Sequence, residues 1–214
     1  MAAWARSLAA SGDEELRQRV EYAASRLEDA GNEYHLAALF DMAGLSSLRA
    51  GRDQDATRYL QRAVPLARRL REAYPWMHLR TKVGVAAIFT GEIAAAHDAF
   101  GEALTLSRTL VVPAFTSLCL DGLAAVAAVD GDLDRAARLA GAAAAHRAET
   151  TDDTLDARLR AAFLEPARAA SGIRTWDDVA ARDGAALTID EAIEYALEGP
   201  RSEFRIHAQA GPHH

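Results

Sequence analysis

The chain has 214 residues, a formal net charge of −7 and 50 alanines, while aromatic residues make up only 7% of it. Helix formers at this density, with few aromatic and β-branched residues, predict an all-α protein and exclude collagenous, disulfide-built and disordered classes. Cys119 is the only cysteine, which excludes an intrachain disulfide and a multi-cysteine metal site.

The N-terminal ten residues lack the apolar stretch of a signal peptide. The longest strongly apolar run, Leu123–Val129, is far shorter than the roughly 20 residues that a membrane-spanning helix needs. A cytoplasmic protein without membrane contact is therefore expected. The sequence lacks the motifs of nucleotide-binding loops, dinucleotide folds, serine hydrolases, zinc proteases and EF-hands, so no cofactor and no metal are expected.

An internal repeat of 40 residues organises the first part of the chain. Its most specific markers are three glycines, Gly51, Gly91 and Gly131, because glycine is rare in this sequence. In each copy an apolar helix ends at the glycine and a second helix begins just after it. Glycine is expected there because the chain leaves the first helix through a residue with left-handed (αL) backbone angles. Small residues keep the same period, which lets the two antiparallel helices approach closely. They occupy positions 44, 84 and 124 and positions 56, 96 and 136.

This pattern resembles the tetratricopeptide repeat, whose helix pairs carry small, small, large and small residues around a turn glycine. The first copy matches at Gly44, Gly51, Ala56, Leu60 and Ala63, and the second at Gly84, Gly91, Ala96, Phe100 and Ala103. The third copy is degenerate at Ala124 and Ala140, and Leu16, Val20, Ala23 and Leu27 fit the second helix of an earlier copy. That earlier copy would begin with a short helix at Ala2–Ala10. The resemblance implies an α-α superhelix of about four helix pairs over residues 1–150.

The period stops after Arg147, and residues 151–199 predict a small helical C-terminal cap, followed by a flexible tail at 200–214. A helix over Thr154–Ala170 should kink or split near Leu164, because Pro166 lies inside it. A short helix should start at Thr175–Asp178 and end at Gly184. Thr188-Ile189-Asp190-Glu191 has the form of a capping box that opens a last helix ending at Leu197.

Two segments carry a second, more specific resemblance. The helix Leu133–Ala143 looks like the "ERAARLLGAA" helix near the C-terminus of large actinobacterial regulators. Trp176–Leu197 looks like the pattern W-x-x-G-x-x-L-[ST]-x-[DE]-E-A-x-x-x-A-L with which these regulators end, and we call it the tryptophan-to-"DEA" segment. Those proteins are MalT-like, with a signal-transduction ATPase followed by helical repeats, and many carry a LuxR-type DNA-binding or a cyclase domain. This sequence contains neither the ATPase nor a DNA-reading motif. The resemblance implies either the repeat domain of such a regulator or a stand-alone relative.

The charge distribution argues against direct nucleic-acid binding. Residues 151–200 contain 11 acidic and 5 basic side chains, a net charge of −6, so the remainder is close to neutral. A polyphosphate backbone would be repelled by the first part and not attracted by the second.

In tetratricopeptide repeats the first helices line the concave face, and carrying their groove positions over predicts the site. The groove would be mostly apolar with a few polar points, as in a ligand or peptide site; alternatively, some of these residues pack against a neighbouring repeat. Asp41, Thr81 and Asp121 recur at one position of the repeat, which favours a lined face. The predicted groove residues are Asp41, Leu45, Arg49, His78, Thr81, Val85, Phe89 and Asp121.

Three functions remain open from the sequence. The first is a sensor or interaction domain that receives a small-molecule effector or a protein partner in the groove, without catalysis of its own. The second is a stand-alone enzyme that uses Asp41, His78 and Asp121 as acid–base groups. The third is a scaffold or dimerisation element, and a homodimer is compatible with each of them.

Overall fold

The computed structural model describes residues 13–147 and 153–198. Within these ranges every regular element is a helix and there is no strand, so the predicted all-α superhelix of helix pairs is confirmed. The expected helix at Ala2–Ala10 and the expected tail at 200–214 lie outside the described residues.

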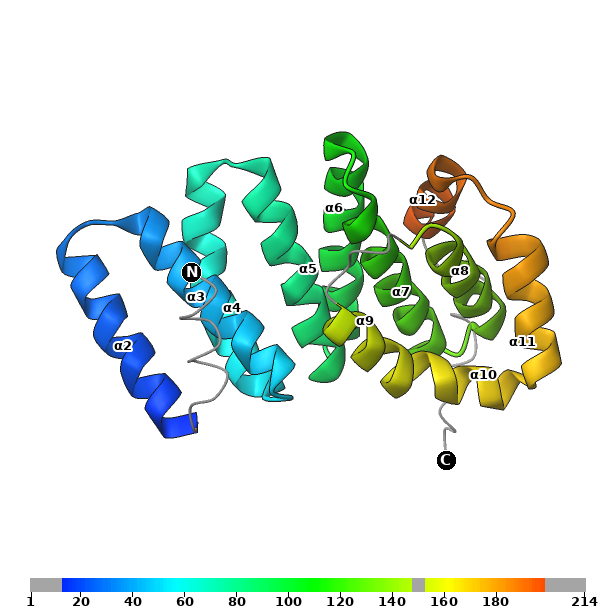
Figure 1. Ribbon diagram of the computed structural model, residues 1–214, viewed down its shortest axis with the longest axis horizontal. Coiled ribbons are helices and arrows are strands. Elements are labelled where there is room, and N and C mark those ends of the chain that lie inside the picture. Colours follow the sequence, from blue (N-terminus) through cyan, green and yellow to red (C-terminus); the bar gives the residue numbers. More distant parts are fainter. Residues whose placement is uncertain (1–12, 148–152, 199–214) are drawn as a thin grey trace, which may run out of the picture.

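The repeat consists of helices that pack side by side with alternating direction (Figure 1). The helices of each predicted copy form a pair, α3 with α4, α5 with α6 and α7 with α8, and α2 packs against α3. Leu16 and Val20 of α2 are buried, as expected for the second helix of an earlier copy. The bounds are α2 (Asp13–Asp29), α3 (Glu33–Arg49), α4 (Asp53–Leu70), α5 (Ala73–Phe89), α6 (Ile93–Leu110), α7 (Pro113–Val129) and α8 (Leu133–Ala145).

The turns between these helices share one backbone geometry. The expected glycines Gly51, Gly91 and Gly131 have φ values of 72°, 82° and 82°. In the first of these turns the amide of Arg52 donates to the carbonyl of Ser47 at 2.9 Å, which satisfies one of the open carbonyl groups at the helix end. Arg71 and Val111, between the pairs, adopt the same conformation without being glycine, at φ 56° and 55°. Left-handed turn residues therefore recur every 20 residues, once per helix.

Glycines inside the helices make room for large side chains of the partner helix. A Cβ atom on Gly44 would lie 2.6 Å from the Leu60 side chain, and one on Gly84 would lie 2.8 Å from Phe100. Gly122 approaches Phe100 from the next pair, where a Cβ would lie 2.5 Å from the ring. The small and large positions of the repeat therefore interlock within pairs, and Phe100 also links two pairs.

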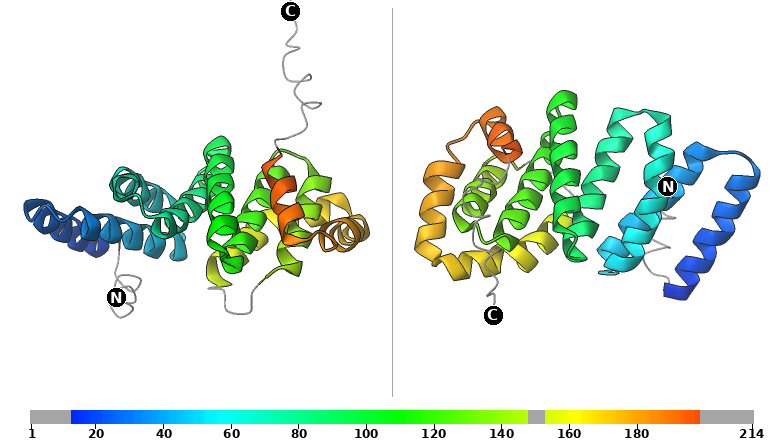
Figure 2. Two further views of the ribbon diagram at one scale, coloured as in Figure 1. Left: turned by 90° about the horizontal axis from the view of Figure 1, so that it is seen from above. Right: turned by 180° about the vertical axis from the view of Figure 1, so that it is seen from behind.

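After the repeat the chain turns back and crosses its own helices. The crossing segment consists of α9 (Asp153–Leu159), the π-helical turn η1 (Arg160–Leu164) and α10 (Glu165–Ser171). It runs along the ends of α5, α7 and α8 at the lower edge of Figure 1 and again in the view from behind in Figure 2. The expected split near Leu164 takes the form of the π-turn. Pro166 lies two residues after this turn, and it disturbs the regular helix because proline cannot donate a backbone hydrogen bond.

The rest of the cap contains α11 (Ile173–Val179), a second π-helical turn η2 (Ala180–Gly184) and α12 (Ile189–Leu197). The short helix expected from Thr175 thus begins two residues earlier, at Ile173, and η2 continues it to Gly184, where it was expected to end. The capping box of Thr188 and Glu191 is confirmed. η2 packs against α8 backbone to backbone. A Cβ on Gly141 would lie 2.2 Å from the Ala180 carbonyl oxygen, and one on Gly184 would lie 2.3 Å from that of Arg138.

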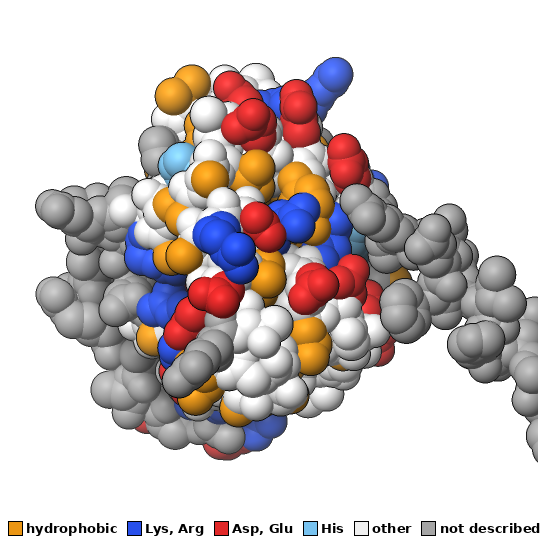
Figure 3. Space-filling view, turned by 90° about the vertical axis from the view of Figure 1, so that its right-hand side faces the viewer, with side chains coloured by type: hydrophobic (Ala, Val, Ile, Leu, Met, Phe, Trp, Pro, Cys, Tyr) orange, Lys and Arg blue, Asp and Glu red, His pale blue; other side chains and the backbone are white. Residues whose placement is uncertain are grey.

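Acidic and basic side chains are interspersed over the end of the molecule that the cap forms (Figure 3). Ion pairs account for part of this pattern, including Arg168–Asp177 at 2.7 Å and Arg138–Asp183 at 3.6 Å. A charged outer surface is what a repeat array needs at its last unit, which has no neighbour to cover an apolar face.

Candidate functional site

The first helices of the three pairs, α3, α5 and α7, carry the predicted groove residues, and the structure divides their surface in two. We call the part near their C-terminal ends, which the segment α9–η1–α10 crosses, the covered half. We call the part near the N-terminal ends of α3 and α5 the cavity half. Asp41 and His78 line the cavity half, whereas Phe89 and Asp121 contact the chain's own C-terminal residues.

An arginine of α9 fastens the covered half. Arg158 donates to both carboxylate oxygens of Asp53, at 2.7 and 2.5 Å, and to the carbonyl of Leu48 at 3.2 Å. Its guanidinium carbon lies 3.7 Å from the centre of the Phe89 ring, a cation–π arrangement, and Phe163 of η1 packs on the same ring at 5.1 Å. Phe89 therefore meets a residue of its own chain where the sequence analysis expects a ligand.

A buried network of charges closes the covered half further along. Asp121 of α7 is 1% exposed and accepts from Arg147 at 2.7 Å and from Arg160 at 3.5 Å. Arg147 also donates to Asp156 of α9 at 2.6 Å, and the Asp156 side chain has no exposed area. Burial raises the pKa of the Asp121 carboxyl, while the two guanidinium groups offset part of that shift. The network holds α9 and η1 against α7.

The predicted groove needs correction at three residues. Thr81, Val85 and Asp121 are at most 1% exposed and do not line an open groove. The hydroxyl of Thr81 donates to the Met77 carbonyl at 2.9 Å, inside its own helix. They are buried because the helix pairs pack tightly and the C-terminal segment covers α7. Leu45 is half-buried against the core and Arg49 is exposed near the end of α3, outside the cavity.

The cavity half contains a hollow of about 240 Å³ between α3, the end of α4 and the start of α5. Its walls are mainly alanine, leucine and proline, with aromatic and acidic side chains among them. The small size of Ala37, Ala38 and Ala67 leaves the space open. The lining residues are Tyr34, Ala37, Ala38, Asp41, Ala67, Leu70, Glu72, Tyr74, Pro75, His78 and Leu79.

An ion pair lies beside the cavity and joins two helix pairs. Lys82 of α5, the only lysine of the chain, donates to the two carboxylate oxygens of Asp41 in α3 at 2.7 and 2.5 Å. The Lys82 side chain is 10% exposed and that of Asp41 is 25% exposed. The pair is therefore partly shielded from water, and the Asp41 carboxylate remains accessible from the cavity.

His78 is a neutral histidine in this environment. Burial, and secondly the nearby Lys82 ammonium, lower its pKa from 6.5 to about 4, although Asp41 acts in the opposite direction. Its ring lies between those of Tyr74 and Phe115, with centroid distances of 4.5 and 4.0 Å. Its Nε2 atom is buried and has no hydrogen-bond partner among the described residues. At neutral pH the imidazole adds no positive charge to the cavity.

Four residues that line or adjoin the cavity are not predicted from the sequence: Tyr34, Tyr74, Glu72 and Lys82. A signal was present for the two tyrosines, because they stand 40 residues apart at the same position of successive copies. Lys82 could have been singled out as the only lysine, one position after the predicted Thr81. No sequence pattern indicates that Glu72 reaches the same cavity.

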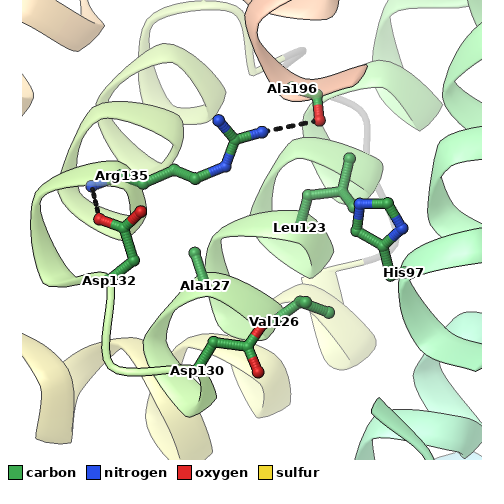
Figure 4. A pocket seen from close by; sticks show the side chains of 8 residues that line it. All are labelled: His97, Leu123, Val126, Ala127, Asp130, Asp132, Arg135 and Ala196. Atoms are coloured by element: carbon green, nitrogen blue, oxygen red, sulfur yellow. Dashed lines mark hydrogen bonds between the residues drawn. The ribbon is translucent and has the colours of Figure 1, made fainter. Parts of the chain in front are cut away.

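A second, much smaller depression of about 40 Å³ lies between α6, the α7–α8 turn and α12 (Figure 4). Asp132 caps α8 by accepting from the amide of Arg135 at 3.1 Å. The Arg135 guanidinium donates to the carbonyl of Ala196 at 3.0 Å and to two further carbonyls at the end of α12, where a cation stabilises the helix end. Two of its polar side chains thus anchor helix ends. We take the cavity between α3 and α5 as the candidate site because it contains two of the predicted groove residues, Asp41 and His78.

Comparison of the chain with protein-family models, with curated proteins and with solved structures found no match. The class that the structure itself defines is an all-α helical repeat with a helical cap. No helix among residues 13–147 and 153–198 is long and apolar enough to cross a lipid bilayer. The same residues contain no group of three or more His, Cys, Asp or Glu side chains that could hold a metal ion.

Proposed function

We propose that this chain is the ligand-binding sensor domain of a MalT-like transcriptional regulator, and that it takes a small-molecule effector in the cavity between α3 and α5. The single observation that carries the binding role is this cavity, which combines apolar walls with Asp41, Glu72, two tyrosines and a neutral histidine. A mostly apolar hollow with a few convergent polar groups is the usual form of a small-molecule site.

The contact between α8 and η2 supports the assignment to MalT-like regulators. Gly141 lies in the "ERAARLLGAA"-like segment and Gly184 lies in the tryptophan-to-"DEA" segment, and the structure packs these two glycines into one backbone contact. The residues that carry the resemblance are thus parts of one packed unit. In this proposal ATP hydrolysis and DNA binding belong to other domains of the regulator.

The structure separates the acid–base candidates of the enzyme hypothesis. Asp41 and His78 line the same cavity, but Asp121 is buried against Arg147 and Arg160 in the covered half. Asp41 is itself held by Lys82. A binding role needs no further rearrangement of these groups, and we therefore favour it over catalysis.

The proposal is tested by blocking the cavity without touching the core. Ala38 lines the cavity and is not fully buried, so Ala38→Leu should fill the space. The control is Ala144→Leu at an exposed position of α8. A panel of small acids, amines and alcohols is screened against the full chain by saturation-transfer NMR, and hits are measured by calorimetry.

We expect Ala38→Leu to weaken every genuine hit at least about tenfold, because the leucine occupies the space of the ligand. Ala144→Leu should bind like the parent, and both variants should keep the parent's melting temperature within a few degrees. Hits that bind both variants equally would place the site elsewhere. A parent that binds nothing in the panel would favour the scaffold hypothesis.

A further inference from the structure

We propose that the cavity between α3 and α5 selects a small organic amine in its protonated form, with a compact apolar skeleton. This inference rests on the proposed ligand-binding function and adds the chemical class of the ligand. It follows from the charges at the cavity, from the aromatic side chains among its lining residues and from its size.

The charge of the lining residues is negative. Among the lining residues in the described part of the chain, Asp41 and Glu72 are charged, His78 is neutral at pH 7, and there is neither a lysine nor an arginine. Lys82 balances Asp41 from outside the lining. Glu72 precedes the first turn of α5, is exposed, and its carboxylate makes no hydrogen bond or ion pair within the described part of the chain. One carboxylate that forms no ion pair within the described residues therefore faces an incoming ligand.

The arginines at the end of α4 are directed to other contacts. Arg69 is paired with Glu33 at 2.9 Å. Arg68 lies 5.5 Å from the centre of the Trp76 ring, and Arg68 and Arg71 line a separate depression to which Glu72 also contributes. These cations reduce the negative potential at the rim, but none of them lines the cavity itself.

Aromatic side chains add a second attraction for a cation. Tyr34 and Tyr74 line the cavity and are about half exposed, so that a ligand can reach both rings. Electron-rich ring faces attract ammonium groups, and the attraction adds to that of a nearby carboxylate. His78, between Tyr74 and Phe115, does not oppose a cation because it is neutral at pH 7.

The size and walls of the cavity limit the skeleton of the ligand. A cavity of about 150 Å³ holds a benzene molecule, so 240 Å³ accommodates roughly ten non-hydrogen atoms. The walls Leu70, Pro75 and Leu79 offer no hydrogen-bonding side chains, which favours hydrocarbon over a sugar or a nucleotide. An arylalkylamine of this size meets both requirements.

The test compares three probes that share one skeleton and differ in charge: 3-phenylpropylamine, 3-phenylpropan-1-ol and 3-phenylpropanoate. Each is titrated into the full chain at pH 7 by calorimetry. We expect the amine to bind at least about tenfold more tightly than the propanoate, with the alcohol between them, since one favourable charge contact at a partly exposed site has about this effect.

Glu72→Gln supplies the residue-level test. It should weaken the amine about three- to tenfold and leave the alcohol unchanged. The matched control is Glu92→Gln, because Glu92 occupies the same position before α6, is exposed and lies outside the cavity. Glu92→Gln should leave all three affinities unchanged.

The outcomes separate the two proposals. Equal binding of the three probes, abolished by Ala38→Leu, would overturn the amine class and retain the cavity as a site. Tighter binding of the propanoate would also overturn the amine class and would assign the dominant field to Arg68 and Arg71. A parent that binds none of the probes, or probe binding that Ala38→Leu does not affect, would overturn the amine class together with the cavity.

Discussion

The covered half spans the first helices α3, α5 and α7 and the cavity half spans α3 and α5, yet the chain itself fills the first whereas the second is hollow. In the covered half, Arg158 and Phe163 of the C-terminal segment contact Phe89, and Arg147 and Arg160 neutralise Asp121. In the cavity half none of residues 153–198 lines the space between α3 and α5. Two of the eight predicted groove residues, Asp41 and His78, therefore line a space that a ligand can enter.

Asp41 and Asp121 show the difference at one position of the repeat. They stand two periods apart, and both form ion pairs. The Asp41 side chain is 25% exposed and lies beside a cavity, whereas the Asp121 side chain is 1% exposed because the C-terminal segment covers it. Equivalent repeat positions thus acquire different roles because a non-repeated segment covers one of them.

The largest effect is expected from Asp121→Ala. Removal of this carboxylate takes one of two shared partners from Arg147 and Arg160, which keep Asp156. A broken buried ion pair costs about 3–5 kcal/mol, somewhat less here because both arginines are partly exposed and retain that second partner. Asp41→Ala should cost about 1–2 kcal/mol, because its pair is more exposed. Urea unfolding of both variants measures the difference. Equal losses would remove the energetic distinction between the two halves.

A somewhat smaller effect is expected from Gly141→Ala, about 2–3 kcal/mol, because the new Cβ would lie 2.2 Å from the backbone oxygen of Ala180 and force η2 away from α8. Gly101→Ala in α6 is the control, since its Cβ would meet only the Leu197 side chain at 3.7 Å. That variant should be neutral or up to about 1 kcal/mol more stable, as alanine favours helix. Thermal unfolding measures both variants. Equal changes in their melting temperatures would contradict the close packing of η2 on α8.

The cavity half should respond to pH through His78. Its pKa is about 4 in the folded chain and 6.5 without the protein environment, so the unfolded chain binds more protons between these values. Stability is therefore expected to fall as the pH is lowered from about 6.5 to 4. Asp121, with its raised pKa, acts in the opposite direction in both the parent and a His78→Phe variant.

The contribution of His78 is the difference between these two proteins. We expect the parent to lose about 1–2 kcal/mol more than His78→Phe between pH 7 and pH 4.5, a value reduced because the ring is partly exposed. Chemical denaturation at several pH values measures it. Parallel stability curves would show that His78 titrates normally.

The smallest effect is expected at Val111, an exposed turn residue outside both halves. Its φ of 55° is unfavourable for a β-branched side chain, so Val111→Gly should stabilise the chain by about 0.5–1 kcal/mol. Because Val111 does not line the cavity, probe affinities should not change. A loss of stability, measured by urea unfolding, would show that the valine side chain contributes more than its conformation costs.

The repeat could be predicted from the sequence because its causes are local. Gly51, Gly91 and Gly131 mark left-handed turns, and the pairs Gly44–Leu60 and Gly84–Phe100 mark close helix contacts, so spacing alone indicates both. The split near Pro166 and the capping box at Thr188 follow from the chemistry of single residues. The turns at Arg71 and Val111 could not be predicted, because their residue types do not favour that conformation.

The division of the concave face could not be predicted, because its contacts are distant in sequence. Arg158 meets Asp53 across 105 residues, and nothing local to either residue indicates the pairing. The cavity likewise depends on what is absent, since Ala37, Ala38 and Ala67 leave space that larger side chains would fill. Asp41 and His78 could be placed near a site from the repeat pattern, whereas Glu72 required the three-dimensional structure.

The central claim is that the segment α9–η1–α10 occupies the covered half and confines a ligand to the cavity half. Amide hydrogen exchange of the full chain, read by mass spectrometry, tests it most directly and requires no ligand. We expect peptides within residues 153–171 to exchange nearly as slowly as those of α7, because Leu159 and Asp156 are fully buried and the segment is fastened by Arg158 and Arg147. Complete exchange of these peptides within seconds, while α7 stays protected, would mean that the groove is open along its whole length and would contradict this claim.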